Sequence, residues 1–224
     1  MPSLSDLDLR PSLLLAMWTA GMAFGVAVVA WWRVVGPAYL WVAGGSALLA
    51  GAFAAFGGPW AAAGAVLLIV GIVLARRPVW AAPAFALSGI AYLVHASALA
   101  GPITAVTGAV ALGGVTCEML LGHWYLVDPS LPRWALRRLD IAGGIGLIAD
   151  MAVIALAGAM ATDAWVLEWA WLGLGAFSVL LMVGVWFSIK EEGYEGVMAA
   201  TGLSYLAVLT SLGSVALGRI LLQL

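Results

Sequence analysis

The chain has 224 residues, of which 65% are hydrophobic and only 9% are charged, against roughly 25% charged residues in soluble domains. This composition excludes an ordinary soluble domain, and the formal net charge of −2 gives no basic surface for nucleic acid. The single cysteine, Cys117, excludes an internal disulfide and a CxxC redox or zinc motif. Continuous apolar runs and 28 glycines favour a helical membrane protein over a barrel.

The segment before the first apolar run lacks the features of a cleavable signal peptide. Asp6 and Asp8 stand where a basic region would be needed, and the following run is long enough to span a bilayer. We therefore expect this run to remain in the protein as its first membrane-spanning helix.

Eight apolar runs approach the length of about 20 residues that a membrane-spanning helix needs. Gly and Pro fall between the runs, where loops are expected. The break FGGPW at 56–60 is so short that the second and third runs could also form one kinked or re-entrant pair. The whole chain, 1–224, is predicted to be a single transmembrane domain. The predicted helices cover residues 12–32, 38–56, 59–75, 79–99, 103–126, 139–160, 165–189 and 196–219.

Basic residues are unevenly divided between the two sides of this predicted bundle. One side has only Arg10 and Arg219, whereas the loops on the other side have seven basic residues. Because loops rich in Lys and Arg stay in the cytoplasm, both termini are expected outside it. The predicted fold is thus an all-α integral membrane protein of the cell membrane, a polytopic bundle of about eight transmembrane helices. The seven basic residues are Arg33, Arg76, Arg77, Arg133, Arg137, Arg138 and Lys190.

Glu118 and Asp150 lie deep inside predicted helices, where an ionisable group is costly and is a candidate for function. Glu118 is eight residues before the inner end of the fifth helix, about 12 Å deep, and Asp150 is eleven residues past the inner end of the sixth, about 16 Å deep. The loop between these helices, 127–138, is expected to lie at the membrane surface with Trp134 among the headgroups. Since consecutive antiparallel helices are usually neighbours, the two acids are predicted to lie at similar depth.

Glycines occupy the same helix face as each acid, and small residues let helices approach closely. We expect the two glycine faces to meet and to bring Glu118 near Asp150, so that two carboxyl groups could share a proton. Tyr125, on the same side of the helix as Glu118, would extend this proton-transfer site. The alternative is a pair of protonated acids that merely hydrogen-bond across the contact. The glycines are Gly114, Gly122, Gly143 and Gly146.

The motif GHWY, at 122–125, lies about one turn inside the inner membrane surface. His123 is predicted to contact a quinone-like headgroup, with Trp124 or Tyr125 as a packing wall, because most ligand pockets are apolar with a few placed polar groups. The alternative is an aromatic belt at the interface with a solvated histidine.

The second histidine lies near the outer end of the fourth helix. His95 and Tyr92 share a helix face there and could bind a cofactor such as haem b, or His95 could be a hydrogen-bonded histidine of the core. Because His95 and His123 are predicted at opposite membrane surfaces, we do not expect one haem to join them.

These candidates suit a quinone-interacting or proton- or electron-transferring membrane subunit of a respiratory-type complex, with other redox subunits as partners in the lipid bilayer. A small-solute or ion transporter that uses Glu118 and Asp150 is the alternative, and a structural membrane subunit is another. The sequence contains no nucleophile elbow, phosphate-binding loop or HExxH motif, and no metal site is predicted.

Overall fold

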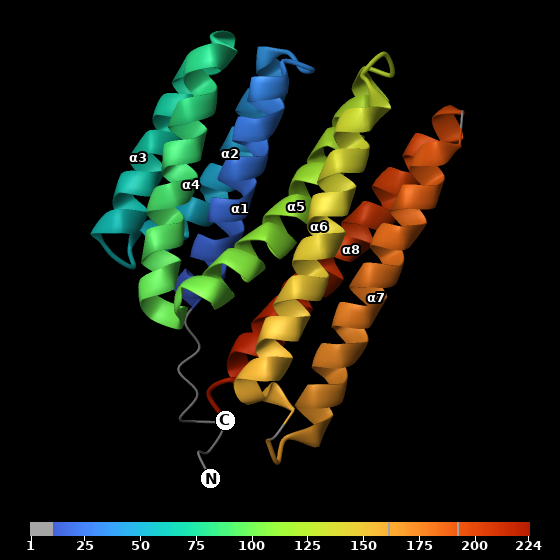
Figure 1. Ribbon diagram of the computed structural model, residues 1–224. Coiled ribbons are helices and arrows are strands. Elements are labelled where there is room, and N and C mark those ends of the chain that lie inside the picture. Colours follow the sequence, from blue (N-terminus) through green and yellow to red (C-terminus); the bar gives the residue numbers. More distant parts are fainter. Residues whose placement is uncertain (1–10, 161, 192) are drawn as a thin grey trace.

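The computed structural model describes residues 11–160, 162–191 and 193–224, which form eight long helices with no strand among these residues (Figure 1). All eight are long and apolar enough to cross a membrane, as the sequence predicts. The residues behind the signal-peptide prediction, Asp6 and Asp8, and also Arg10, lie outside the described residues. The helices are α1 (Pro11–Trp32), α2 (Pro37–Ala55), α3 (Pro59–Val73), α4 (Pro78–Ala100), α5 (Pro102–Val127), α6 (Arg133–Ile154), α7 (Trp165–Lys190) and α8 (Tyr194–Leu221).

Proline marks the start of five helices, which is why the predicted starts of these helices agree with the observed ones to within one residue. A proline in the first turn gives up an N–H that has no partner there, and its ring already holds φ near the helical value. Gly101, between α4 and α5, has a φ of 82°, which a residue with a side chain rarely adopts. The five prolines are Pro11, Pro37, Pro59, Pro78 and Pro102.

The second and third helices are separate elements that pack against each other, not a kinked or re-entrant pair. The helical segment that begins with α3 continues through a 3-10 turn, Leu74–Arg76, and covers 18 residues in all. Two helices that are long and apolar enough to cross a membrane therefore occupy residues 37–76, and the number of such helices among the described residues is even.

The start of α6 differs from the prediction. It begins at Arg133 rather than at residue 139, so residues 133–138 belong to the helix and not to a surface loop. A search for apolar runs misses this part because it is rich in Arg, although Arg and Leu favour helices. The six additional residues lengthen the helix by about 9 Å. At its other end, α6 passes into a π-helical turn, Ala155–Ala159, in which Gly158 has a φ of 105°.

The helices form two groups of four, α1 to α4 and α5 to α8, which are joined mainly where α1 packs on α5 (Figure 1). Glycines make this joint very close. A Cβ on Gly113 of α5 would lie 2.1 Å from the backbone of Gly21 on α1. On the other side of α5, a Cβ on Gly114 would lie 2.6 Å from Gly143 of α6. Gly114, Gly143 and Gly146 thus lie in the α5–α6 contact as predicted, whereas Gly122 faces Thr201 of α8 instead.

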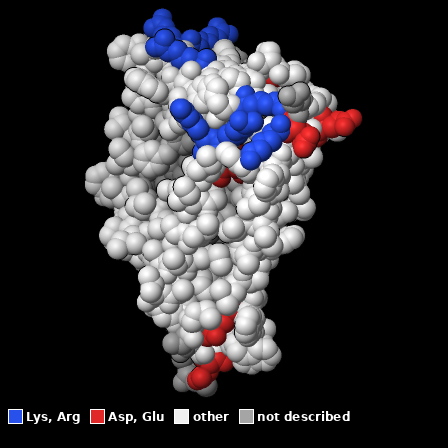
Figure 2. Space-filling model, turned by 45° about the vertical axis from the view of Figure 1, so that its right-hand side comes forward, with Lys and Arg blue, Asp and Glu red and all other residues white. Residues whose placement is uncertain are grey.

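Basic side chains collect at one end of the bundle, which we call the basic end (Figure 2). The loops α1–α2, α3–α4, α5–α6 and α7–α8 lie at one end of the ribbon in Figure 1, and in the view of Figure 2 the opposite end shows acidic but no basic side chains. Pro11 and Gln223 line one cavity at that opposite end, so α1 begins and α8 ends on the same side. Arg219 belongs to neither surface, because it is 8% exposed and lies inside the bundle.

Replacing Gly113 with Ala is expected to destabilise the fold, since the added methyl group would collide with the α1 backbone. Overpacking of this kind costs about 1–3 kcal/mol, which thermal unfolding in detergent would detect as a lower midpoint. Gly173→Ala on α7 is the matched control, because a Cβ there meets nothing within 4 Å. Equal midpoints for the two variants would contradict the close α1–α5 contact.

Candidate functional site

Glu118 lies in the middle of the bundle, on α5, with no exposed surface. Its Oε2 atom meets the hydroxyl of Ser204 on α8, and its Oε1 atom is buried without a hydrogen-bond partner among the described residues. No Lys or Arg forms an ion pair with it in the part of the chain that the structure describes. A buried carboxyl group without a cation is expensive to keep charged, so its surroundings favour a bound proton.

The hydrogen bonds around Ser204 are compatible with a proton on Glu118. The serine oxygen lies within hydrogen-bonding distance of Glu118 and 2.8 Å from the carbonyl oxygen of Ala200. A hydroxyl group has one proton and can donate it to only one of two acceptors. If Glu118 carries a proton, it donates to Ser204 and Ser204 donates to Ala200, so that both contacts become hydrogen bonds.

Gly122 and Thr201 complete this side of the site. A Cβ on Gly122 would lie 2.9 Å from the Thr201 hydroxyl oxygen and 3.7 Å from Oε1 of Glu118. Because Gly122 has no side chain, both Oε1 of Glu118 and the Thr201 hydroxyl group border the space beside it. Tyr39 of α2 lies close enough to interact electrostatically with Glu118, and its buried hydroxyl group has no partner among the described residues.

A second acid approaches this site from α6. Asp140 is 4% exposed, its Oδ1 atom has no partner in the described part of the chain, and its charge acts on Glu118. Asp140 also lines a groove of about 350 Å³ between α6 and α7. The acid of α6 that lies within electrostatic range of Glu118 is thus Asp140 rather than Asp150, and it also borders the outside of the bundle.

The predicted pairing of Glu118 with Asp150 is wrong. Asp150 accepts a hydrogen bond of 2.7 Å from Thr107 on α5, and Glu118 lies eleven residues further along that helix, about 16 Å away along its axis. The early start of α6 causes the error, because it moves Asp150 deeper into the bundle and places Asp140 near the level of Glu118.

Asp150 instead forms a buried ion pair with Arg219 of α8. The guanidinium group donates to both carboxylate oxygens, at 2.5 Å to Oδ2 and 2.6 Å to Oδ1, and also to the carbonyl oxygen of Thr104 at 2.7 Å. Two-pronged Arg–carboxylate contacts of this kind are strong and geometrically specific. Both charges are compensated, so the pair fixes α5, α6 and α8 to one another and leaves Asp150 no free carboxyl oxygen.

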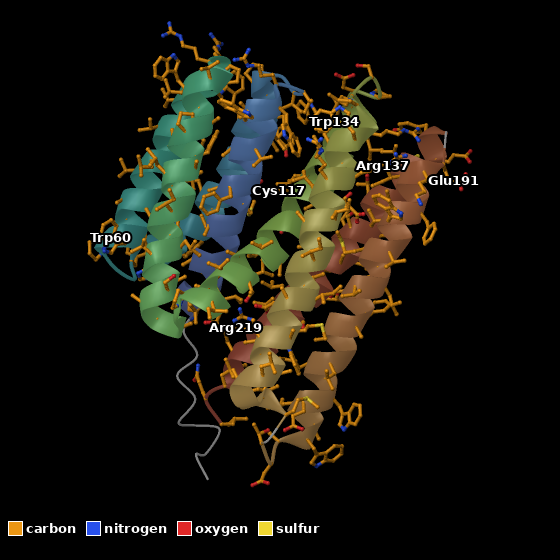
Figure 3. All side chains as sticks on the ribbon, viewed as in Figure 1. Trp60, Cys117, Trp134, Arg137, Glu191 and Arg219 are labelled. Atoms are coloured by element: carbon orange, nitrogen blue, oxygen red, sulfur yellow. The ribbon has the colours of Figure 1, made fainter. Side chains whose placement is uncertain are left out.

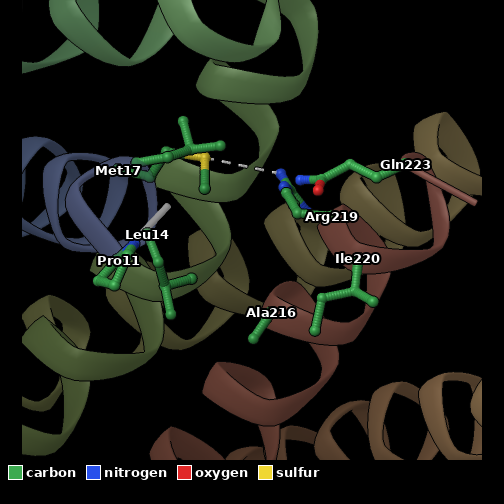
Figure 4. Close-up of a pocket in the computed structure, with 8 residues that line it drawn as sticks. Pro11, Leu14, Met17, Ala216, Arg219, Ile220 and Gln223 are labelled. Carbon is green, nitrogen blue, oxygen red and sulfur yellow. Dashed lines mark hydrogen bonds between the residues drawn. The ribbon is translucent and has the colours of Figure 1, made fainter. Parts of the chain in front are cut away.

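Arg219 also borders a cavity of about 240 Å³ between α1 and α8. Figures 3 and 4 show it reaching from α8 toward α1, where its Nη2 atom lies 3.8 Å from the sulfur of Met17. Leu14, Ala216 and Ile220 make the remaining wall largely apolar. The one charged residue among the described residues that line this cavity is therefore Arg219, and its charge is already paired with Asp150.

The GHWY residues do not share one surface. His123 is exposed, and its Nδ1 atom lies 3.2 Å from the hydroxyl group of Tyr205 on α8. Trp124 packs edge-to-face on Tyr39, with ring centroids 5.9 Å apart. Tyr125 turns inward and donates a hydrogen bond to the carbonyl of Leu131. The polar contact is therefore a His123–Tyr205 pair on the outside, and Tyr125 supports the α5–α6 loop.

His95 and Tyr92 belong to the other group of helices. His95 is 7% exposed and its Nε2 atom is unpartnered within the described residues. It lies against the α2–α3 turn, where a Cβ on Gly57 would come 2.8 Å from that nitrogen. Tyr92 is fully buried beside Gly51 and Gly64. His95 and Tyr92 thus pack against glycines of α2, of α3 and of the turn between these helices.

No group of three His, Cys, Asp or Glu residues that could hold a metal ion occurs among the described residues. No protein-family description, curated protein or solved structure matches this chain. The function is therefore inferred from the contacts of the buried residues.

Sequence reasoning missed Asp140, Arg219 and Ser204. Asp140 is the second residue of the predicted helix 139–160, whereas with the observed start at Arg133 it lies about two turns inside the helix. Arg219 is the last residue of the predicted helix 196–219, and no local pattern marks it as buried. Ser204 lies inside that same predicted helix, and no local pattern distinguishes it from polar residues that merely pack between helices.

Replacing Asp150 with Asn is expected to destabilise the protein by about 3–5 kcal/mol, since it leaves the buried Arg219 without its counter-ion. The double variant Asp150→Leu with Arg219→Met should recover most of this loss, because apolar groups of similar volume often replace a buried pair without cost. Thermal unfolding in detergent measures both. If Asp150→Asn unfolds like the unaltered protein, the pair does not hold these helices together.

Proposed function

We propose that the chain is an integral protein of the cell membrane with both termini outside the cytoplasm. Eight spans put α1 and the end of α8 on one side, and the basic end supplies the cytoplasmic loops that the distribution of Lys and Arg requires. In this orientation Glu118 lies in the half of the membrane that faces the cytoplasm.

Labelling of single cysteines tests this orientation. Cys117 is buried and is first replaced with Ala, and then Ser130→Cys and Asp163→Cys are made at exposed loop positions. A membrane-impermeant maleimide added to intact cells should label the Asp163→Cys variant, whereas the Ser130→Cys variant should react only after permeabilisation. The reverse pattern would invert the proposed topology.

We propose further that the protein transfers protons within the membrane, and that Glu118 is the group that binds them. The observation that carries this proposal is its carboxyl group, fully buried, without a cation, and bonded to a serine that already has an acceptor. The contrast with Asp150 supports it, because that acid is neutralised by Arg219. A permanent positive charge beside a carboxyl group favours its charged form, whereas a buried carboxyl group without one more readily takes up a proton.

Asp140 is the proposed connection to the basic side. It borders the α6–α7 groove and acts electrostatically on Glu118, so a proton that reaches Asp140 has a second carboxyl group ahead of it. We place this activity in a proton- or electron-transferring subunit of a respiratory-type complex, with other membrane or redox subunits as partners. A proton-coupled transporter is the alternative that would use the same two acids.

Glu118→Gln is expected to remove the exchangeable proton while keeping the shape and polarity of the side chain. Infrared spectra of the protein in vesicles should show a pH-dependent carbonyl band from a buried carboxylic acid, and this band should be missing in the variant. In vesicles with an imposed membrane potential, proton influx should fall by about 10²-fold or more, as is typical when a proton-transfer group is lost.

The control is Glu195→Gln, which changes an exposed acid at the start of α8. It should keep both the buried-carboxyl band and the proton influx. The proposal fails if the infrared spectra of Glu118→Gln and the unaltered protein coincide at every pH.

A second candidate function is contact with a quinone at the His123–Tyr205 pair. An imidazole and a phenol hydroxyl group, 3.2 Å apart on the outside of α5 and α8, can hydrogen-bond a quinone carbonyl that arrives from the lipid. Tyr205 follows Ser204 in sequence, so this pair lies one residue from the Glu118 site. Reduction of a quinone takes up protons, and an acid beneath the contact is suited to supply them.

His123→Ala is expected to weaken quinone retention without affecting stability, because the imidazole is exposed. Solvent extraction of the protein purified in mild detergent, followed by chromatography, would measure the quinone bound per chain. Tyr194→Ala, at an exposed aromatic near the basic end, is the control. Equal quinone content in all three proteins, or none in any, removes this candidate.

A further inference from the structure

The outward side of α1 carries a ridge of three side chains. Phe24, Val28 and Trp32 are four residues apart, so they form a line along the helix. The ridge separates two hollows, and the same three residues line both of them. This face of the bundle is therefore two parallel grooves with one shared wall.

Both grooves have apolar walls. The first, of about 290 Å³, lies between α1, α5 and α6 and includes Gly114 and Ala142. The second, of about 440 Å³, lies between α1 and α4 and includes Pro83. The first groove follows α1 from Gly21 to Trp32, a length of about 16 Å. Grooves of this length and lining fit hydrocarbon chains that lie parallel to the helices.

Arg138 of α6 stands where the first groove reaches the basic end. Its guanidinium group lies 4.8 Å from the ring centroid of Trp134 and 5.8 Å from that of Trp32, and the two rings pack edge-to-face at 5.0 Å. The group is thus held in place by aromatic faces. No described residue forms an ion pair or hydrogen bond with it, although its side chain is exposed. The site presents a positioned cation without an anion.

We propose that this face binds one anionic glycerophospholipid, with its phosphate on Arg138 and its two acyl chains in the grooves on either side of the α1 ridge. A guanidinium group binds a phosphate oxygen pair in a planar, two-pronged contact. Basic pockets between transmembrane helices recognise anionic lipid headgroups in the same way. Trp32 lies at the top of the ridge, where the glycerol backbone divides into two chains.

Other occupants fit this face less well. A quinone has one chain and an uncharged headgroup, so it would leave Arg138 without an anion. A second protein chain would need an acid that meets the guanidinium group and a side chain for each groove. Lipid matches all three features at once. The proposal does not depend on the function of Glu118, since Glu118 lines neither groove.

Native mass spectrometry of the delipidated protein in detergent tests the proposal. The probes are phosphatidylglycerol and phosphatidylcholine with identical acyl chains, added separately and in competition. The unaltered protein should retain one phosphatidylglycerol in preference to phosphatidylcholine. Arg138→Gln should reduce that preference roughly fivefold, the effect of one cationic contact at a membrane surface. Arg138→Lys keeps the charge and should retain most of the preference.

Two further variants separate the headgroup from the chains. Arg77→Gln removes an exposed basic residue from another loop of the basic end and should leave the preference unchanged. Ala142→Phe fills the first groove and should weaken retention of both lipids alike. Thermal unfolding confirms that each variant is folded.

The outcomes that overturn the proposal are distinct. Equal retention of the two lipids by the unaltered protein excludes recognition of the headgroup. An equal effect of Arg77→Gln and Arg138→Gln means that the lipid responds only to overall charge. If Ala142→Phe has no effect, the chains lie elsewhere. A quinone retained in place of phosphatidylglycerol, or a dimer that Arg138→Gln dissociates, assigns the face to those occupants instead.

Discussion

The close approach of α5 to its neighbours is the constraint on which the other contacts depend. Gly113 and Gly114 are adjacent in sequence, yet one touches the backbone of α1 and the other the backbone of α6. Since apolar side chains gain little from one another in a lipid environment, close van der Waals packing must hold such helices together. With side chains at these two positions, α5 could not serve both groups of four helices, and the bundle would separate along this joint.

Two buried acids, Asp150 beside α5 and Glu118 on it, differ in how their charge is compensated. Toward one end, Thr107 assists the Asp150–Arg219 pair, where a full positive charge meets a full negative charge. Nearer the basic end, Glu118 meets only hydroxyl groups and another acid. A buried pair is costly to break but chemically inert, whereas an uncompensated carboxyl group lowers its cost by taking up a proton. The two acids therefore differ: Asp150 is held in an ion pair with Arg219, whereas Glu118 has no cation beside it among the described residues.

The number and approximate bounds of the helices could be predicted, because Pro and Gly mark the breaks between helices and the apolar runs show their lengths. The wrong start of α6 shows the limit of this reasoning. The three arginines at 133–138 are compatible both with a helix and with a loop at the membrane surface, so composition does not locate the helix start. A shift of six residues then exchanged Asp150 for Asp140 as the neighbour of Glu118. Ser204 and Arg219 could not be assigned either, because α8 meets α5 through long-range packing that no local pattern encodes.

These contacts give α8 two unlike attachments to α5. Arg219 attaches one end through its ion pair with Asp150 and its bond to Thr104, while Ser204 attaches the middle through its contact with Glu118. If Glu118 is charged, Ser204 has two acceptors and one hydrogen to donate, so one of the two contacts must be weaker. Tyr205, the next residue, meets His123 on the outside of the same helix pair. A change in the protonation of Glu118 therefore acts on α8 at the one segment that also carries the outer polar pair, and the distant ion pair keeps the rest of the helix in place.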